Sequence, residues 1–265
     1  MNILTNLNTA ALAFIDREDT QALALCVEYS LQPERILDAI YQRKNYKCLP
    51  AVASLFSLLF KFDQQHPLCV SILLDLFERK EYTVLSSFPL LDDFDLDFFI
   101  EQALERKVAI DFDISPLFTE DCKVHYYTAI LKEDCLELFL VHEKDIKTSI
   151  GENRFYKIVV KNSSLQILRH AGINQEQCKW CVSDLLNDSG RKGPSEKKEE
   201  LLEHLCSLYD HRALLSEYLV WGFTCNYLPV TKLLIKLGAS IDEATKRKMQ
   251  TKNPKLYMQL FAEDV

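Results

Sequence analysis

One pair of cysteines has the spacing of a metal site. Cys178-Lys-Trp-Cys181 is followed by His204, Cys206 and His211, and a structural zinc ion needs four such ligands in a tetrahedron. The same spacing fits a helix, because residues three apart share one face. A zinc knuckle needs a turn, and no glycine follows Cys181. We therefore favour two buried helical cysteines, with zinc bound by Cys178, Cys181, His204 and Cys206 as the weaker alternative and redox chemistry as a minor one.

Cysteine and histidine side chains are also the parts of a nucleophilic catalytic site. No stretch resembles a known local nucleophile signature, and thiols embedded in helices are usually inert. The segment Gly190-Arg-Lys-Gly193 lacks the Lys-Ser/Thr and the preceding strand of a phosphate-binding loop. We expect no catalytic residue and no cofactor. An enzyme with an unrecognised cysteine/histidine site in a helical domain stays as the alternative.

A cluster of carboxylates suggests either calcium binding or the start of a helix. Asp92, Asp93, Asp95 and Asp97 alternate in part with aromatic and apolar residues, and the glycine and distal glutamate of a calcium loop are missing. Carboxylates favour the positive end of a helix dipole. We predict that they begin a helix that runs to about Lys107.

The overall charge sets limits on the partners. The 265 residues carry a formal net charge of −8 with a pI near 5.3, which argues against general affinity for nucleic acid or anionic membrane. The longest apolar stretch, residues 49–60, is shorter than the roughly 20 residues that a membrane-spanning helix needs. Nine irregularly spaced cysteines and no evident secretory signal predict a reduced, intracellular, cytoplasmic protein, or an effector exported without a cleaved signal.

Two basic clusters allow a nuclear location as an alternative. They are Arg191 and Lys192 with Lys197 and Lys198, and the run 246–248. Solvated charge at a loop and at a helix end is the preferred interpretation.

The apolar pattern predicts helices along the whole chain. In the first part we expect helices over 10–15, 19–29, 34–42, 51–62 (after Pro50, and buried on several sides) and 68–79. In the second part we expect helices over 123–131, 135–141, 153–161, 164–170, 175–186, 195–209 (with Ser195 as N-cap), 212–224 and 228–237, and a single capping helix over 243–265. Strand-like alternation is nowhere sustained.

The segment 217–242 has the plan of a helix, a short turn, a second helix and a glycine stop. Val230, Leu233, Leu234 and Leu237 form one helical stripe, and Gly238 stands where a left-handed residue ends the helix. Residues 230–242 closely resemble the second half of an ankyrin repeat.

The resemblance weakens toward the N-terminus. It is partial for 154–174 and faint for 125–146, and no clear repeat precedes residue 115. The Thr-Pro-Leu-His start of the consensus is absent, and Asn226 replaces the usual glycine between the helices. Gly172 and Gly238 are 66 residues apart, twice the 33-residue period.

The resemblance implies an all-α protein with an irregular helical region at 1–115 and ankyrin-like helix-turn-helix repeats, stacked as a solenoid, at 116–265. A non-repetitive helical domain is the alternative. Degenerate ankyrin repeats of this type occur in viral host-range proteins, in bacterial effectors and in eukaryotic adaptors. The resemblance therefore implies a protein-protein interaction module or adaptor, of which a host-interacting effector or viral host-range factor is one form. Binding would use the concave face and the loop tips, and the acidic charge favours a basic partner. Trp221, Phe223 and Tyr227 are the candidate contacts, although packing of one or two of these rings in the core is the preferred interpretation.

Overall fold

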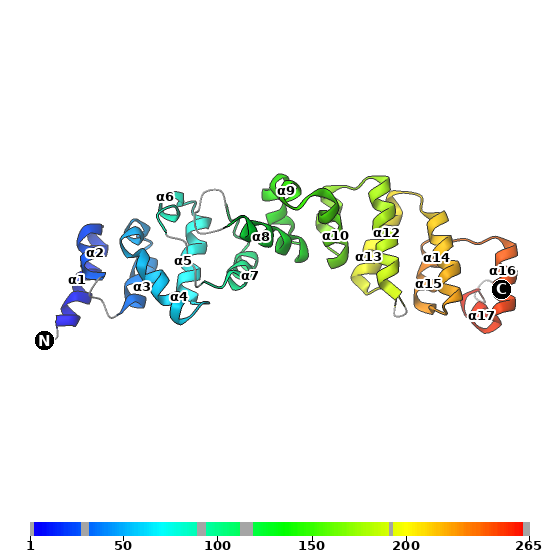
Figure 1. Ribbon diagram of the computed structural model, residues 1–265, viewed down its shortest axis with the longest axis horizontal. Helices are drawn as coiled ribbons and strands as arrows, with labels where there is room; N and C mark the ends of the chain where they lie inside the picture. Colours follow the sequence, from blue (N-terminus) through cyan, green and yellow to red (C-terminus); the bar gives the residue numbers. More distant parts are fainter. Residues whose placement is uncertain (1–2, 28–31, 89–93, 112–118, 191–192, 262–265) are drawn as a thin grey trace. The chain divides into compact units, whose positions relative to one another are not determined.

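A computed structural model describes residues 3–27, 32–88, 94–111, 119–190 and 193–261 (Figure 1). These residues form α-helices and one 3-10 helix, and none of them forms a strand, so the predicted all-α class is confirmed. None of the described helices is both long and apolar enough to cross a membrane.

The chain divides into two compact units, and the division falls within helices α8 (Glu120–Lys132) and α9 (Leu136–Ile150). The boundary predicted near residue 115 lies in a segment outside the described residues. The first unit also contains α1 (Ile3–Arg17), α2 (Thr20–Val27), α3 (Pro33–Arg43), the 3-10 helix η1 (Tyr46–Val52), α4 (Ala53–Phe62), α5 (Pro67–Glu78), α6 (Tyr82–Leu85) and α7 (Leu96–Arg106).

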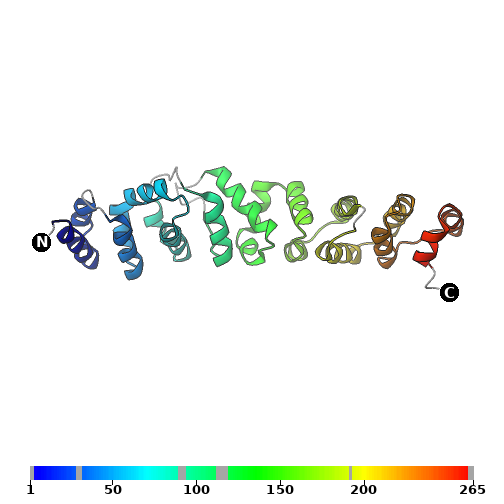
Figure 2. The same ribbon diagram turned by 90° about the horizontal axis from the view of Figure 1, so that it is seen from below.

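The second unit continues with consecutive helix pairs. They are α10 (Glu152–Asn162) with α11 (Leu165–Ala171), α12 (Gln175–Ser189) with α13 (Glu196–Leu208), α14 (Arg212–Thr224) with α15 (Leu228–Lys236), and α16 (Glu243–Lys252) with α17 (Pro254–Phe261). The two helices of the α14–α15 pair pack side by side, as Figures 1 and 2 both show. The first helices begin at unequal intervals, at residues 152, 175, 212 and 243, so the pairs do not keep one fixed period.

The same kind of turn follows a helix at several places in both units. Seven non-glycine residues of the described chain have a positive φ between 51° and 61°, and each follows a helix: Glu18, Lys44, Lys80, Lys107, Asp134, Ser163 and Asn226. At all of these except Asp134, the residue after the left-handed one donates its N–H to the carbonyl five residues earlier, as Tyr227 does to Gly222 at 2.8 Å. This is the Schellman arrangement, which satisfies carbonyls that the helix end would otherwise leave unpaired. Four of the seven turns lie in the first 115 residues, at Glu18, Lys44, Lys80 and Lys107.

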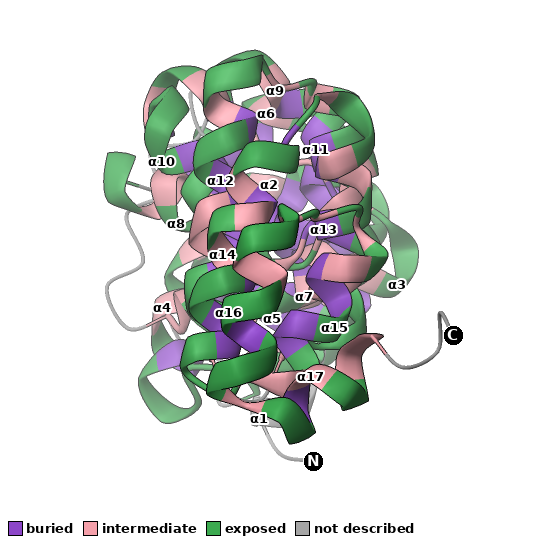
Figure 3. Ribbon diagram, turned by 90° about the vertical axis from the view of Figure 1, so that its right-hand side faces the viewer, coloured by how far each residue is buried: buried purple, intermediate pink, exposed green. Residues whose placement is uncertain are grey.

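Single apolar faces hold the helices together. In α15, Val230, Leu233 and Leu234 are buried as predicted, and Leu237, just after the helix, is partly buried. Figure 3 shows buried positions on one side of α15 and exposed positions on the other. In the first unit, aromatic rings fill the core, with Phe56 and Phe88 in an edge-to-face contact at 4.9 Å between centroids.

Several predicted details of the first unit need correction. Pro50 lies inside η1, so the following helix begins at Ala53 and not at residue 51. Helix α4 was predicted to be buried on several sides, but its buried residues Leu55, Phe56, Leu59 and Phe60 form one stripe. Leu58 is 41% exposed and Phe62 is 83% exposed. The carboxylate cluster does begin a helix: Asp95 caps α7 by accepting the N–H of Phe98 at 3.0 Å, and this hydrogen bond lowers the pKa of Asp95. Two of its members, Asp92 and Asp93, lie outside the described residues.

The second unit brings further corrections. Ser195 occupies the N-cap position of α13, but its side chain makes no capping hydrogen bond. The C-terminal segment forms two helices, because Pro254 cannot continue α16 and begins α17 instead. Of the basic clusters, Lys198 pairs with Asp188 and Lys246 pairs with Glu243, whereas Arg191 and Lys192 lie outside the described residues.

Gly238 provides a direct test of the helix stop. Its φ is +89°, and a Cβ added there would meet no atom within 4 Å, so Gly238→Val would act through backbone strain alone. We expect a loss of about 1–2 kcal/mol in the free energy of unfolding of this region. Urea denaturation would measure it, with Gly238→Asn as the matched control, since asparagine tolerates the left-handed region better. Equal stability of wild type and Gly238→Val would contradict the assigned backbone conformation.

Candidate functional site

The predicted metal ligands lie on two helices, Cys178 and Cys181 on the inner face of α12 and His204 and Cys206 on α13. Cys178 and Cys181 are both fully buried, on a helix that begins with a complete capping box between Asn174 and Gln177. No group of three or more cysteine, histidine or acidic residues in the described part of the chain is arranged to hold a metal ion. The helical interpretation of Cys178 and Cys181 is therefore confirmed, and the geometry gives the zinc alternative no support.

Cys178 instead contacts His211, one of the histidines that follow the Cys178-Lys-Trp-Cys181 pair in sequence. Its Sγ lies 3.3 Å from Nε2 of His211 and donates to the carbonyl of Leu205 at 3.4 Å. Burial, with a smaller effect of the nearby Cys206, raises the pKa of the Cys178 thiol to about 12. Burial also lowers the pKa of His211. Both groups are neutral near pH 7, so the contact ties α12 to the start of α14 and does not activate a nucleophile.

The predicted binding aromatics separate into two environments. Phe223 is only 3% exposed and packs against Met249 and Leu256, so it belongs to the core and is not a surface contact. Trp221 is 40% exposed, and its ring meets the ring of Tyr227 edge to face with 5.1 Å between centroids. Two of the three candidate residues therefore stand together at the surface.

The candidate binding site with the largest number of charged and polar side chains is a groove between α10 and α12, which we call the α10–α12 groove. These helices pack against each other in the second unit and border a cavity of about 1040 Å³. The lining residues come from the exposed face of α10, the first turns of α12 and the end of α8: Lys132, Asn153, Arg154, Tyr156, Lys157, Ile158, Lys161, Asn162, Asn174, Glu176, Gln177 and Trp180.

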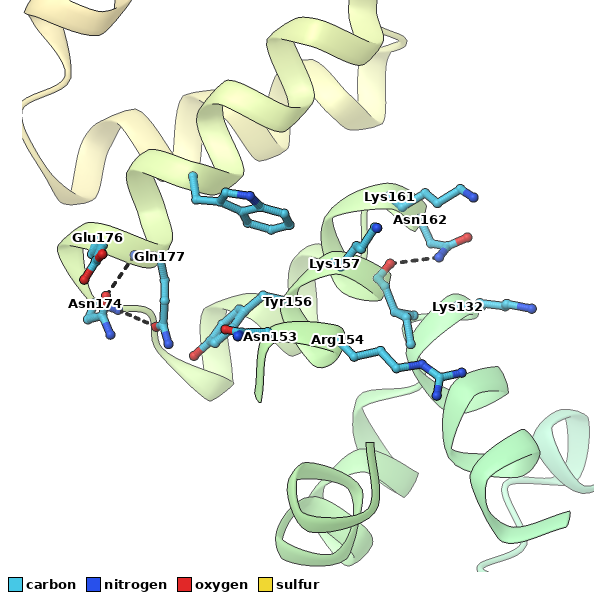
Figure 4. A pocket seen from close by; sticks show the side chains of 12 residues that line it. Lys132, Asn153, Arg154, Tyr156, Lys157, Lys161, Asn162, Asn174, Glu176 and Gln177 are labelled. Carbon is cyan, nitrogen blue, oxygen red and sulfur yellow. Dashed lines mark hydrogen bonds between the residues drawn. The ribbon is translucent and has the colours of Figure 1, made fainter. Parts of the chain in front are cut away.

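The α10–α12 groove is cationic in a chain of net negative charge. Arg154, Lys157 and Lys161 project from α10, and Lys132 stands beside them (Figure 4). All four are exposed, and none forms an ion pair with any described residue. The single carboxylate in the lining is Glu176. Four cations that pair with no carboxylate of the described residues therefore line a space with one acidic side chain in its wall.

Two aromatic side chains also line the groove, Trp180 and Tyr156. Trp180 lies between the two buried cysteines in sequence, so the turn of the helix carries its ring outward, where it is 43% exposed. Tyr156 is buried on the α10 side and donates its hydroxyl to the carbonyl of Gly172 at 2.8 Å. The amide of Gln177 donates to Glu152 at 2.8 Å, which links α12 to the start of α10. The groove thus combines a fixed framework with one exposed indole ring.

The sequence contains a signal for this groove that belongs to no catalytic or metal-binding motif. Arg154, Lys157 and Lys161 follow one another at steps of three and four residues, which places them on one face of a helix. Lysine near the end of a helix is usually explained by its interaction with the helix dipole. That explanation accounts for Lys161 alone and does not draw attention to the cationic face. The position of Trp180 opposite this stripe depends on how α10 and α12 pack.

Comparisons with known proteins provide no family for this chain: no family profile, no curated protein and no solved structure matches it.

The buried His211 predicts how stability depends on pH. Its pKa in the folded state lies below the unfolded value near 6.5, since burial disfavours the imidazolium and outweighs the opposing effect of Asp210. As the pH falls below about 6.5, the unfolded chain takes up a proton that the folded chain does not, so stability present above that pH is lost below it. The His211→Gln variant should lose less stability between pH 7 and pH 5, by at most about 1.4 kcal/mol per pH unit. Urea midpoints across this range would measure the difference, with His204 still titrating in both proteins, and parallel curves would contradict the prediction.

Proposed function

We propose that this chain is a protein-binding module and that the α10–α12 groove is its docking site for an acidic segment of a partner. The observation that carries the proposal is a set of four cations, Lys132, Arg154, Lys157 and Lys161, that pair with no described carboxylate and line the same groove as the exposed ring of Trp180. The succession of helix pairs supports it, since such pairs present an exposed face of successive helices to a ligand.

The signs of the charges favour an acidic partner for this groove over the basic partner that the net charge of −8 suggested. Each exposed pair contributes only about 0.2–1 kcal/mol, so affinity requires several carboxylates together. An aromatic anchor at Trp180 would add desolvated contact area, which is where binding energy concentrates at interfaces. A segment with spaced carboxylates and an apolar residue fits both requirements.

A peptide segment is favoured over nucleic acid. A polyanion extends well beyond a groove of this size and would meet the remaining negative charge of the chain. A short acidic peptide places its charge only where the cations are. The cysteine/histidine alternative is less well supported, because the thiol of Cys178 is buried and its pKa is raised.

A charge reversal in the groove tests the proposal. A labelled Asp/Glu-rich peptide of about ten residues, which spans roughly 33 Å when extended, should bind the wild-type chain in a polarisation assay. We expect Lys157→Glu to weaken this binding by about tenfold or more, because it replaces one attraction with a repulsion. The binding should also weaken steeply as salt is raised.

The matched control is Lys232→Glu. Lys232 is exposed on α15 in the same unit and does not line the groove, so the same change of charge there should leave affinity nearly unchanged. Equal losses in the two variants would mean that only net charge matters, and a groove site would be refuted. Tighter binding of a single-stranded oligonucleotide than of the peptide would refute the partner class.

A further inference from the structure

An exposed aromatic cluster lies on α14 and the turn that follows it. Trp221 meets Tyr218 at 6.2 Å and Tyr227 at 5.1 Å between ring centroids, with the rings inclined at 75° and 80°. We call Tyr218, Trp221 and Tyr227 the aromatic cluster. Edge-to-face contacts on both sides hold the indole in one orientation, while Trp221 stays 40% exposed and the neighbouring Val220 is 37% exposed.

The core of the α14–α15 pair does not require this surface. The buried residues of α14 are Leu215, Leu219, Gly222 and Phe223, which lie on the opposite stripe. A large aromatic surface that is held rigid and left outside the core is typical of binding hot spots.

One face of α12 connects the aromatic cluster with the α10–α12 groove. The hydroxyl of Tyr218 lies 3.1 Å from Oδ1 of Asn187 and 3.4 Å from the carbonyl of Ser183. Trp180 and Asn187 are seven residues apart, which is almost two full helical turns, so both stand on the same face of α12. The cationic groove borders this face near its start, and the aromatic cluster borders it near its end.

We infer that the aromatic cluster is a second subsite for the same ligand, and that the ligand is a bipartite segment. Its carboxylates lie in the α10–α12 groove, and a bulky apolar side chain further along the same segment packs on Trp221. This inference rests on the proposed function, and it specifies the partner more narrowly than an acidic segment.

The helix geometry sets the spacing of the two parts. Seven residues of α12 rise roughly 10 Å, and neighbouring helix axes are about 8–10 Å apart. An extended chain covers about 3.3 Å per residue. The apolar residue should therefore follow the last carboxylate by about four to six residues.

The chain contains two tryptophans, and one stands in each subsite. The variant Trp221→Phe leaves Trp180 as the single indole, which reports on the groove. The variant Trp180→Phe leaves Trp221, which reports on the aromatic cluster. Both substitutions keep an aromatic ring, and thermal unfolding would verify that each variant folds as the wild type does.

Three peptides without tryptophan distinguish the subsites. The first is the acidic peptide alone, the second extends it with a leucine about five residues beyond the last carboxylate, in keeping with the spacing above, and the third carries serine in place of that leucine. We expect the acidic peptide to shift the emission of Trp180 only. The leucine peptide should shift the emission of both indoles and bind wild type about tenfold more tightly, while the serine peptide should behave as the acidic one. In Trp221→Ala the gain from leucine should disappear, with unchanged affinity for the acidic peptide.

The outcomes separate the two proposals. If the acidic peptide binds and leucine adds neither affinity nor a change in Trp221 emission, the second subsite is refuted and the groove stands. If Trp221→Ala weakens all three peptides equally, the cluster has only a structural role and the inference is also refuted. If no peptide binds, the proposed function itself fails.

Discussion

The fold depends on how its helices end. Every α-helix leaves its last carbonyls without partners inside the helix, and a chain of short helices meets this cost many times. Here a left-handed residue after the first helix of a pair turns the backbone so that the next N–H groups reach those carbonyls, as at Lys44, Ser163 and Asn226. The turn also returns the chain against the helix it has just left. The same turn therefore pairs two helices and provides hydrogen-bond donors for the last carbonyls of the first.

The α10–α12 groove is a consequence of that arrangement. Once a pair has buried its apolar stripe, the remaining face of its first helix is left for solvent or for a ligand. In α12, four consecutive residues show both faces of the helix. Cys178 and Cys181 are buried in the core, whereas Lys179 and Trp180 are exposed. In α10 the outer face carries Arg154 and Lys157. The cationic stripe and the indole ring face one space because α10 and α12 pack against each other.

The sequence predicted the helices well, since apolar spacing and punctuation by proline and glycine are local signals. Pro33 and Pro67 begin helices as expected, and Gly238 adopts the positive φ assigned to it. The predictions failed at two prolines. Pro50 lies within a 3-10 helix and does not precede the first residue of α4, whereas Pro254 divides a segment predicted as one helix. The ankyrin-like character of the pairs stays a prediction from the residues.

The candidate site was only partly visible in the sequence. The burial of Cys178 and Cys181 followed from helical periodicity. Trp221, Phe223 and Tyr227 were candidate contacts as a group, and the sequence did not tell which of them would be exposed. The separation of Phe223 from Trp221 depends on contacts with Met249 and Leu256, which are distant in sequence. The α10–α12 groove was not predicted for the same reason: its two walls come from different helices, whose packing the sequence pattern does not give.

The turns also carry a consequence for the evolution and engineering of the chain. Glycine would adopt the left-handed conformation without strain, yet these seven positions hold glutamate, lysine, aspartate, serine or asparagine. Each such residue costs up to about 1–2 kcal/mol relative to an unstrained backbone, and lysine recovers part of that through the negative end of the helix that it follows. Backbone strain is therefore distributed over many turns. A substitution at one of them changes the free energy of unfolding there, while the surface that meets a ligand stays unchanged.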